Sequence, residues 1–179
     1  ARRNAMKAAL VVLLFAASAF SQDQAAITAA EAACGPKNIR FDAAEDATKH
    51  PTPQPDSGKA LVYLIQDLGE MQCSECALTK VGLDGTWIGA NQGSSYIFFP
   101  ADPGERHLCV NWQSRLEYRS RAFAMANFTA EAGHVYYFHT RISFSRSIYV
   151  FDLEPVNSDE GKYLVALSAL SVAHPKGKK

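Results

Sequence analysis

The chain has 179 residues, of which 47% are hydrophobic and 20% are charged, a composition that suits one ordinary folded domain with appendages and excludes wholesale disorder. The 18 Lys and Arg residues balance the 18 Asp and Glu residues, so there is no basic excess to hold a nucleic-acid backbone. No apolar run reaches the ~18 residues that a membrane-spanning helix needs.

The first 21 residues have the order of a secretory signal peptide. Arg2, Arg3 and Lys7 form a basic start, Ala8 to Phe20 form an apolar run, and Ala19-Phe20-Ser21 is a small-x-small cleavage site. This order predicts that residues 1–21 are removed and that the mature protein is secreted or periplasmic. A buried N-terminal helix is the alternative interpretation of the same segment.

Residues 22–58 are predicted to be an N-terminal extension that ends in a linker. Ile39 and Phe41 stand at alternate positions and indicate one short strand before Asp46. Between His50 and Gly58, three prolines at alternate positions favour extended polyproline geometry. The main domain is therefore expected to begin at Lys59.

From Lys59 onward, short β-prone segments alternate with turn signals, of which Asp84-Gly85 is the strongest. About eight strands are expected, over Ala60 to Asp67, Leu78 to Leu83, Thr86 to Ala90, Ser94 to Phe99, Glu105 to Gln113, Arg121 to Thr129, His134 to Ile142 and Arg146 to Leu153. No helix-length segment separates them, so the pattern predicts antiparallel pairing. The fold class is therefore all-β, an antiparallel β-sandwich of prealbumin-like or immunoglobulin-like type, with a barrel as the alternative.

The pattern changes after Pro155. Ser158-Asp159-Glu160 offers a cap and an acidic first turn, and four apolar residues then recur at helical spacing: Tyr163, Leu164, Leu167 and Leu170. A short C-terminal helix is therefore expected against the sandwich edge or across one open end. Because Gly161 disfavours a helix, a ninth strand over Tyr163 to Leu167 is the alternative. The domain is placed at residues 59–173, and residues 174–179 are expected to be a solvated basic tail.

Four cysteines are present, and in an exported protein an even count indicates two disulfides. Proximity in the sequence favours Cys73 with Cys76, which leaves Cys34 with Cys109. The second bond would tie the extension to the strand that contains Cys109. The two crossed pairings stay open, because they close longer loops and would restrict the unfolded chain more.

Cys73-Ser-Glu-Cys76 also permits a second function, that of a thiol-disulfide or zinc-dependent envelope enzyme. Redox chemistry of this kind needs a cysteine at a helix N-terminus, whereas this motif lies between two predicted strands. A zinc site needs two more ligands, and there is no second CxxC motif. The sequence also lacks GxSxG, Walker, HExxH and GxGxxG motifs. A noncatalytic module without metal or cofactor is therefore the leading prediction.

The candidate binding residues are exposed aromatic and basic side chains on two predicted strands. If Ile88 faces the core, alternation turns Trp87 outward. The alternative is that Trp87 covers a hairpin end or packs under the C-terminal helix. On the strand His134 to Ile142, Tyr137, His139 and Arg141 share the less apolar face. Such a set suits recognition of a glycan, a peptide or another envelope protein, because aromatic side chains supply contact area at low entropic cost.

Five short stretches, in this order and spacing, resemble the bacterial exported family of unknown function DUF2846. The stretches are Gly58 to Tyr63; Val81 to Gly85 with Ile88-Gly89; Gly93 to Phe98; Asp102 to Gly104 with His107 and Leu108; and Ala132 to Tyr137. The resemblance spans about Lys59 to Leu170. It implies an exported β-sandwich akin to prealbumin-like or carboxypeptidase-regulatory modules, and it carries over no catalytic residue or ligand. Many members are lipoproteins, whereas no cysteine directly follows the apolar run of this chain.

Overall fold

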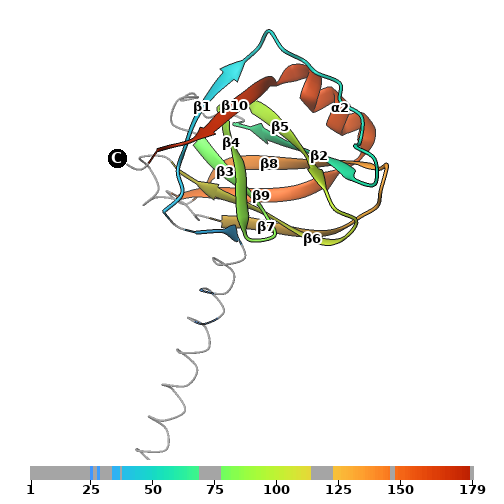
Figure 1. Cartoon of the computed structure of the whole chain (residues 1–179). Coiled ribbons are helices and arrows are strands. Elements are labelled where there is room, and N and C mark those ends of the chain that lie inside the picture. Colours follow the sequence, from blue (N-terminus) through green and yellow to red (C-terminus); the bar gives the residue numbers. More distant parts are fainter. Residues whose placement is uncertain are drawn as a thin grey trace, which may run out of the picture.

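The structure is a computed structural model that describes residues 25, 28, 34–36, 38–68, 78–113, 123–145 and 148–177. Strands dominate the described part of the chain, with one short helix near its C-terminal end (Figure 1). The elements are β1 (Phe41–Asp46), β2 (Ala60–Asp67), β3 (Leu78–Leu83), β4 (Thr86–Gln92), β5 (Ser95–Ala101), β6 (Gly104–Trp112), β7 (Phe123–Ala130), β8 (Val135–Ser145), β9 (Ile148–Val156), α2 (Ser158–Leu167) and β10 (Ala169–Pro175).

The strands form two sheets. One has six strands in the order β1-β10-β5-β2-β8-β9, and the other has four strands in the order β4-β3-β6-β7. All eight strands expected after Lys59 are present, and the bounds of β2 and β3 agree with the prediction. The mostly β architecture in two sheets is therefore confirmed.

The prediction of purely antiparallel pairing is wrong, because the six-stranded sheet contains two parallel pairs, whereas the strand pairs of the four-stranded sheet are antiparallel. Strand β2 pairs in parallel with β8, and β10 pairs in parallel with β5 through Ala169 and Leu170. Between β2 and β8 the chain passes through the four-stranded sheet and back again. That passage supplies the long crossover that parallel strands require, so no helix is needed between them.

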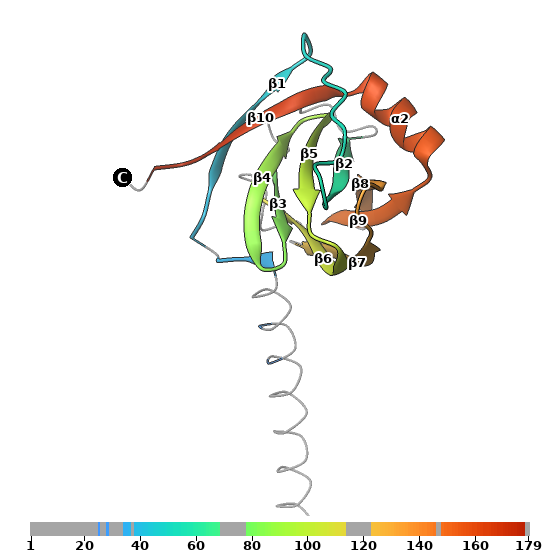
Figure 2. The same cartoon turned by 45° about the vertical axis from the view of Figure 1, so that its right-hand side comes forward.

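The strand β10 is an element that the sequence analysis did not expect. It covers His174 and Pro175, which were assigned to a solvated tail, and it pairs antiparallel with β1 from Phe41↔Pro175 to Asp46↔Leu170. The predicted N-terminal extension therefore contributes an edge strand to the six-stranded sheet. In both views β1 and β10 run side by side away from the body of the molecule (Figures 1 and 2).

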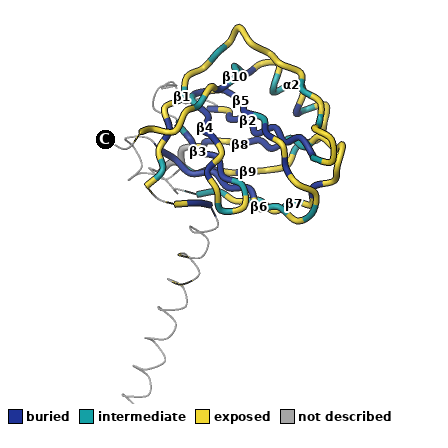
Figure 3. The backbone as a smooth tube through the Cα atoms, in the orientation of Figure 1, coloured by how far each residue is buried: buried dark blue, intermediate teal, exposed yellow. Residues whose placement is uncertain are grey.

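The core lies between the two sheets and follows strand alternation. In β2, Ala60, Val62 and Leu64 face the four-stranded sheet, while Leu61, Tyr63 and Ile65 belong to a separate cluster on the opposite face. The central strands are therefore buried on both faces, as Figure 3 shows for β2. This outer cluster is covered in part by α2.

The C-terminal helix is confirmed over Ser158–Leu167, which excludes a strand over Tyr163 to Leu167. Its N-cap is Asn157, one residue before the predicted cap, and the Asn157 side chain accepts hydrogen bonds from the backbone N–H groups of Asp159 and Glu160. Tyr163 and Leu167 are exposed, whereas Leu164 and Val165 pack against the outer cluster.

Candidate functional site

Trp87 lies on the outer face of the four-stranded sheet, but it is only 8% exposed. A β-bulge shifts the register of β3 and β4, so that Val81 pairs with Gly89 and Gly82 pairs with Trp87. Ile88 has no place in that ladder and is 39% exposed. Trp87 therefore faces away from the core, as alternation predicts, but the expectation that it is exposed is wrong. Ile88 is not a buried core residue, because alternation assumes a regular strand and the bulge interrupts it.

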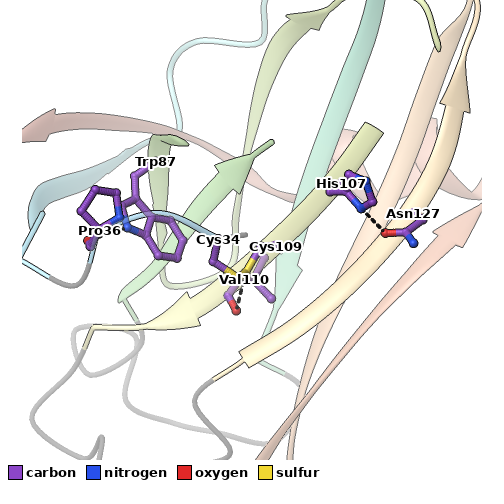
Figure 4. The surroundings of a disulfide bond; sticks show 7 residues. All are labelled: Cys34, Pro36, Trp87, His107, Cys109, Val110 and Asn127. Carbon is purple, nitrogen blue, oxygen red and sulfur yellow. Dashed lines mark hydrogen bonds between the residues drawn. A yellow bond between two sulfur atoms is a disulfide. The ribbon is translucent and has the colours of Figure 1, made fainter. Parts of the chain in front are cut away.

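The N-terminal segment covers Trp87, as Figure 4 shows. The indole Nε1–H donates a 2.9 Å hydrogen bond to the carbonyl oxygen of Pro36. Close contact is possible because Gly35 and Gly82 have no side chain: a Cβ on Gly82 would lie 2.5 Å from the carbonyl oxygen of Cys34. Trp87 therefore acts as a packing surface for this segment.

The predicted disulfide between Cys34 and Cys109 is present, with 5.4 Å between the Cα atoms (Figure 4). Both cysteines are buried in the cluster that contains Trp87. The Gln113 side chain adds a second attachment, since its amide accepts from the N–H of Phe41 and donates to the carbonyl of the same residue. Cys73 and Cys76 lie outside the described residues, so their pairing stays a prediction.

The other three predicted site residues share the outer face of the six-stranded sheet, as expected for alternation along β8. Tyr137 is partly buried, His139 is 3% exposed, and Arg141 is exposed. Helix α2 lies against β8 and β2 on this face. The structure therefore brings Tyr137, His139 and Arg141 together, and it places Trp87 apart from them on the other sheet.

His139 stands among charged groups although it is buried. The Arg141 Nε–H donates to its Nδ1 at 3.4 Å, and Asp67 Oδ2 lies 3.9 Å from its Nε2. Burial, together with the Arg141 charge, lowers the pKa of His139, while Asp67, Glu160 and Glu154 oppose the shift. Neutral imidazole is therefore favoured in the folded protein.

Three tyrosines from three neighbouring strands form the centre of this face. The rings of Tyr63 and Tyr137 stack at 5.1 Å, and the Tyr96 ring lies 6.1 Å from that of Tyr63. Burial, and to a smaller extent the other two tyrosines, raises the pKa of Tyr63 to about 12. Burial also raises the pKa values of Tyr96 and Tyr137. At neutral pH these hydroxyls are therefore hydrogen-bond donors rather than bases.

A cavity of about 360 Å³ opens between these tyrosines and α2, and we call it the tyrosine cavity. Tyr63, Tyr96, Val165 and Ala166 supply much of its wall, and His50, Pro51, Thr52 and Lys162 complete it. Tyr96 is fully buried, and its hydroxyl has no hydrogen-bond partner among residues 34–36, 38–68, 78–113, 123–145 and 148–177. A volume of this size is within the range of small-molecule sites, and a convergent polar group in an apolar wall is typical of them.

Sequence reasoning missed Tyr63, Tyr96 and Lys162 as site residues. Alternation along β2 and β5 already places both tyrosines on the face opposite the core, so that signal could have found them. No local sequence pattern predicts that Lys162 and the His50 segment lie next to β2 and β5. Lys162 reaches the cavity from α2, and His50 reaches it from the connection before β2.

The described part of the chain contains no group of three or more His, Cys, Asp or Glu side chains that could hold a metal ion.

The tyrosines on the outer face of the six-stranded sheet are suited to binding by ring contacts and hydrogen bonds. Among the described helices, none has the length and apolar character for a membrane span.

Comparison with known proteins places the central strands in a family. No curated protein and no solved structure shows significant similarity to the chain. A family model described as "Protein of unknown function (DUF2846)" matches residues 56–152, from just before β2 into β9. These residues include the stretches that carried the resemblance. The match covers more than half of the 179 residues, and the chain belongs to the DUF2846 family.

Proposed function

We propose that this protein is an exported, noncatalytic β-sandwich module that binds a small organic acid with a planar ring in the tyrosine cavity. The single observation that carries the proposal is the buried Tyr96 hydroxyl, which has no hydrogen-bond partner in the described part of the chain and belongs to a residue of the cavity wall. An unpaired buried hydroxyl is costly. A ligand that accepts a hydrogen bond from it would remove that cost.

The wall chemistry supports the ligand class. Tyr63 and Tyr96 offer aromatic surface, and Val165 and Ala166 of α2 offer aliphatic surface, so a flat apolar ring is favoured between them. Lys162 is exposed, lines the cavity, and forms no salt bridge to another described residue. Its ammonium is therefore available to a carboxylate on the ligand.

Two observations support export and binding rather than catalysis. The buried Cys34–Cys109 disulfide is typical of proteins that fold in an oxidising compartment. The raised pKa of Tyr63 keeps its hydroxyl protonated at neutral pH, which suits a donor and not a general base. The predicted signal peptide is consistent with the same location.

Ligand-observed saturation-transfer NMR with a panel of aromatic carboxylates and matched neutral rings tests the proposal. We expect several carboxylates to bind the purified mature protein. Ala166→Trp should fill the cavity and abolish binding, whereas Leu167→Trp, at a neighbouring exposed position that does not line the cavity, should leave binding intact. Lys162→Gln should lower the affinity for the carboxylates at least about tenfold and the affinity for the neutral rings little, because it removes one charge-assisted hydrogen bond.

The proposal is wrong if no compound of the panel binds, or if binding is equal in wild type and Ala166→Trp. Circular dichroism of each variant establishes that the sandwich is intact. Equal weakening of carboxylates and neutral rings by Lys162→Gln would remove the acid from the proposed ligand class.

A further inference from the structure

The interior between the two sheets contains a polar layer at the level where β2 ends. On the six-stranded sheet, Gln66 of β2 pairs with Thr140 of β8. On the neighbouring strand β5, Tyr96 pairs with Ile65. The residue before it, Ser95, therefore lies beside Gln66, on the side of β2 opposite to Thr140. All three side chains are completely buried. By strand alternation, these side chains lie on the same face of the sheet as Leu64 and Phe138, which face the core.

The four-stranded sheet presents a matching row. Thr79 of β3 pairs with Asn91 of β4 on one side and with Trp112 of β6 on the other. All three are completely buried, and Thr79 has the parity of Val81 in the core. The two rows face each other across the sandwich, since the Asn91 Nδ2 group donates a 3.1 Å hydrogen bond to the carbonyl of Leu64 in β2.

Four oxygens of this layer have no hydrogen-bond partner among the residues that the structure describes: Thr79 Oγ1, Asn91 Oδ1, Ser95 Oγ and Thr140 Oγ1. They come from four strands in two sheets, and the ladders fix the Cα positions. Buried polar atoms are almost always paired with protein or with ordered water.

We propose that this polar layer, formed by Thr79, Asn91, Ser95 and Thr140 with Gln66 and Trp112, encloses a small cluster of bound water molecules between the sheets. The layer contains hydroxyl, amide and indole groups and no carboxylate or ammonium, so its chemistry suits a neutral hydrogen-bonding guest rather than an ion. Buried waters of this kind make about three hydrogen bonds each. Four unpaired oxygens on facing rows supply such partners.

The isosteric substitutions Thr79→Val and Thr140→Val test the proposal, because wet and dry layers predict opposite signs. If the layer is dry, removing an unpaired hydroxyl raises Tm, since the buried polar group disappears and the shape is kept. If water fills it, each valine removes a partner of a bound water, and Tm falls. We expect a lower Tm for both variants and no change for Thr86→Val, whose side chain is exposed on β4.

Water relaxation dispersion on the wild-type protein gives an independent measurement that requires no variant to fold. We expect a signal from long-lived internal water, together with water cross-peaks to the methyl groups of Thr79 and Thr140. This signal should fall in the Thr79→Val variant and stay constant in Thr86→Val. A Tm that rises or stays unchanged in both layer variants, or wild-type protein without long-lived water, overturns the proposal.

Discussion

His139 is a buried imidazole whose charged form is disfavoured, and this has a measurable effect on stability. Its pKa is lowered in the folded protein by burial and by Arg141, whereas the unfolded chain has the ordinary value near 6.5. Between the lowered pKa and 6.5, the unfolded state binds more protons than the folded state. The free energy of unfolding therefore rises with pH across that window and levels off above it.

We expect His139→Gln to flatten this dependence. Urea unfolding of wild type and variant, at several pH values from 5 to 8, measures the slope. Because a neutral Gln takes up no proton in either state, the stabilities of the two proteins should differ most near pH 8 and converge as the pH falls. Parallel pH profiles for the two proteins would show that His139 does not carry the effect.

Gly161 is the residue that lets α2 lie on the sheet. A Cβ at this position would be 2.2 Å from Cγ of Tyr137, well inside any contact distance. In an ordinary helix interior, Gly→Ala is favourable by about 1 kcal/mol. Here the sign reverses, because the new methyl group must displace either the Tyr137 ring or the helix.

We expect Gly161→Ala to destabilise the protein by about 1–3 kcal/mol, the usual cost of overpacking. Thermal unfolding followed by circular dichroism measures the change. Gly177→Ala is a suitable control, since a Cβ there has nothing within 4 Å. A Gly161→Ala protein as stable as wild type would mean that α2 does not rest on Tyr137 in solution.

At the scale of elements, the segment around Cys34 is attached to the four-stranded sheet and β1 to the six-stranded sheet. The disulfide to Cys109 closes a loop of 75 residues, and the Gln113 pair of hydrogen bonds anchors Phe41 to the end of β6. The extension is therefore a clamp across the edge of the sandwich rather than a loose appendage.

Replacing both cysteines, as Cys34→Ala with Cys109→Ala, should reduce the free energy of unfolding by about 4 kcal/mol, the chain-entropy cost for a loop of this length. Since the same segment covers Trp87, iodide should quench the Trp87 fluorescence more strongly in the double variant. Trp87→Phe identifies its contribution against that of Trp112. An unchanged Tm with unchanged quenching would show that the Gln113 contacts and packing hold the segment without the bond.

Features that depend on neighbouring residues could be predicted from the sequence, whereas features that depend on distant partners could not. The strands β2 and β3 and the Asp84-Gly85 turn rest on neighbouring residues, and they were predicted well; both turn residues have positive φ, as a two-residue hairpin requires. The strand β10 contains few large β-branched or aromatic residues. It forms by pairing with β1, 134 residues away at Phe41↔Pro175, so no local sequence pattern predicts it.

The candidate site was predicted less well for the same reason. Alternation correctly grouped Tyr137, His139 and Arg141 on one face of β8. It gave the right face for Trp87 but not its burial, because the cover from the Pro36 segment is a tertiary feature. It misplaced Ile88, because the bulge interrupts the alternation. The tyrosine cavity joins four separate parts of the chain, and only the fold brings them together.

For the whole molecule, the family match divides the chain into the family domain, residues 56–152, and the segments before and after it. Tyr63 and Tyr96 lie inside the match, whereas the His50 segment and the α2 residues of the tyrosine cavity lie outside it. The proposed pocket therefore has a wall within the family domain and further walls from flanking segments. If the proposed ligand binds in the tyrosine cavity, ligand choice depends in part on elements that the family model does not include.

The pairing of β1 with β10 also constrains the order of folding. Partners 134 residues apart raise the contact order, and high contact order slows folding. The six-stranded sheet stays incomplete until β10 has paired, and in that interval β5 presents an open edge where β10 will join. Open strand edges recruit other chains. The folding chain is therefore most prone to aggregation before β10 has paired with β5, and a chaperone that covers an exposed strand would be most useful at that stage.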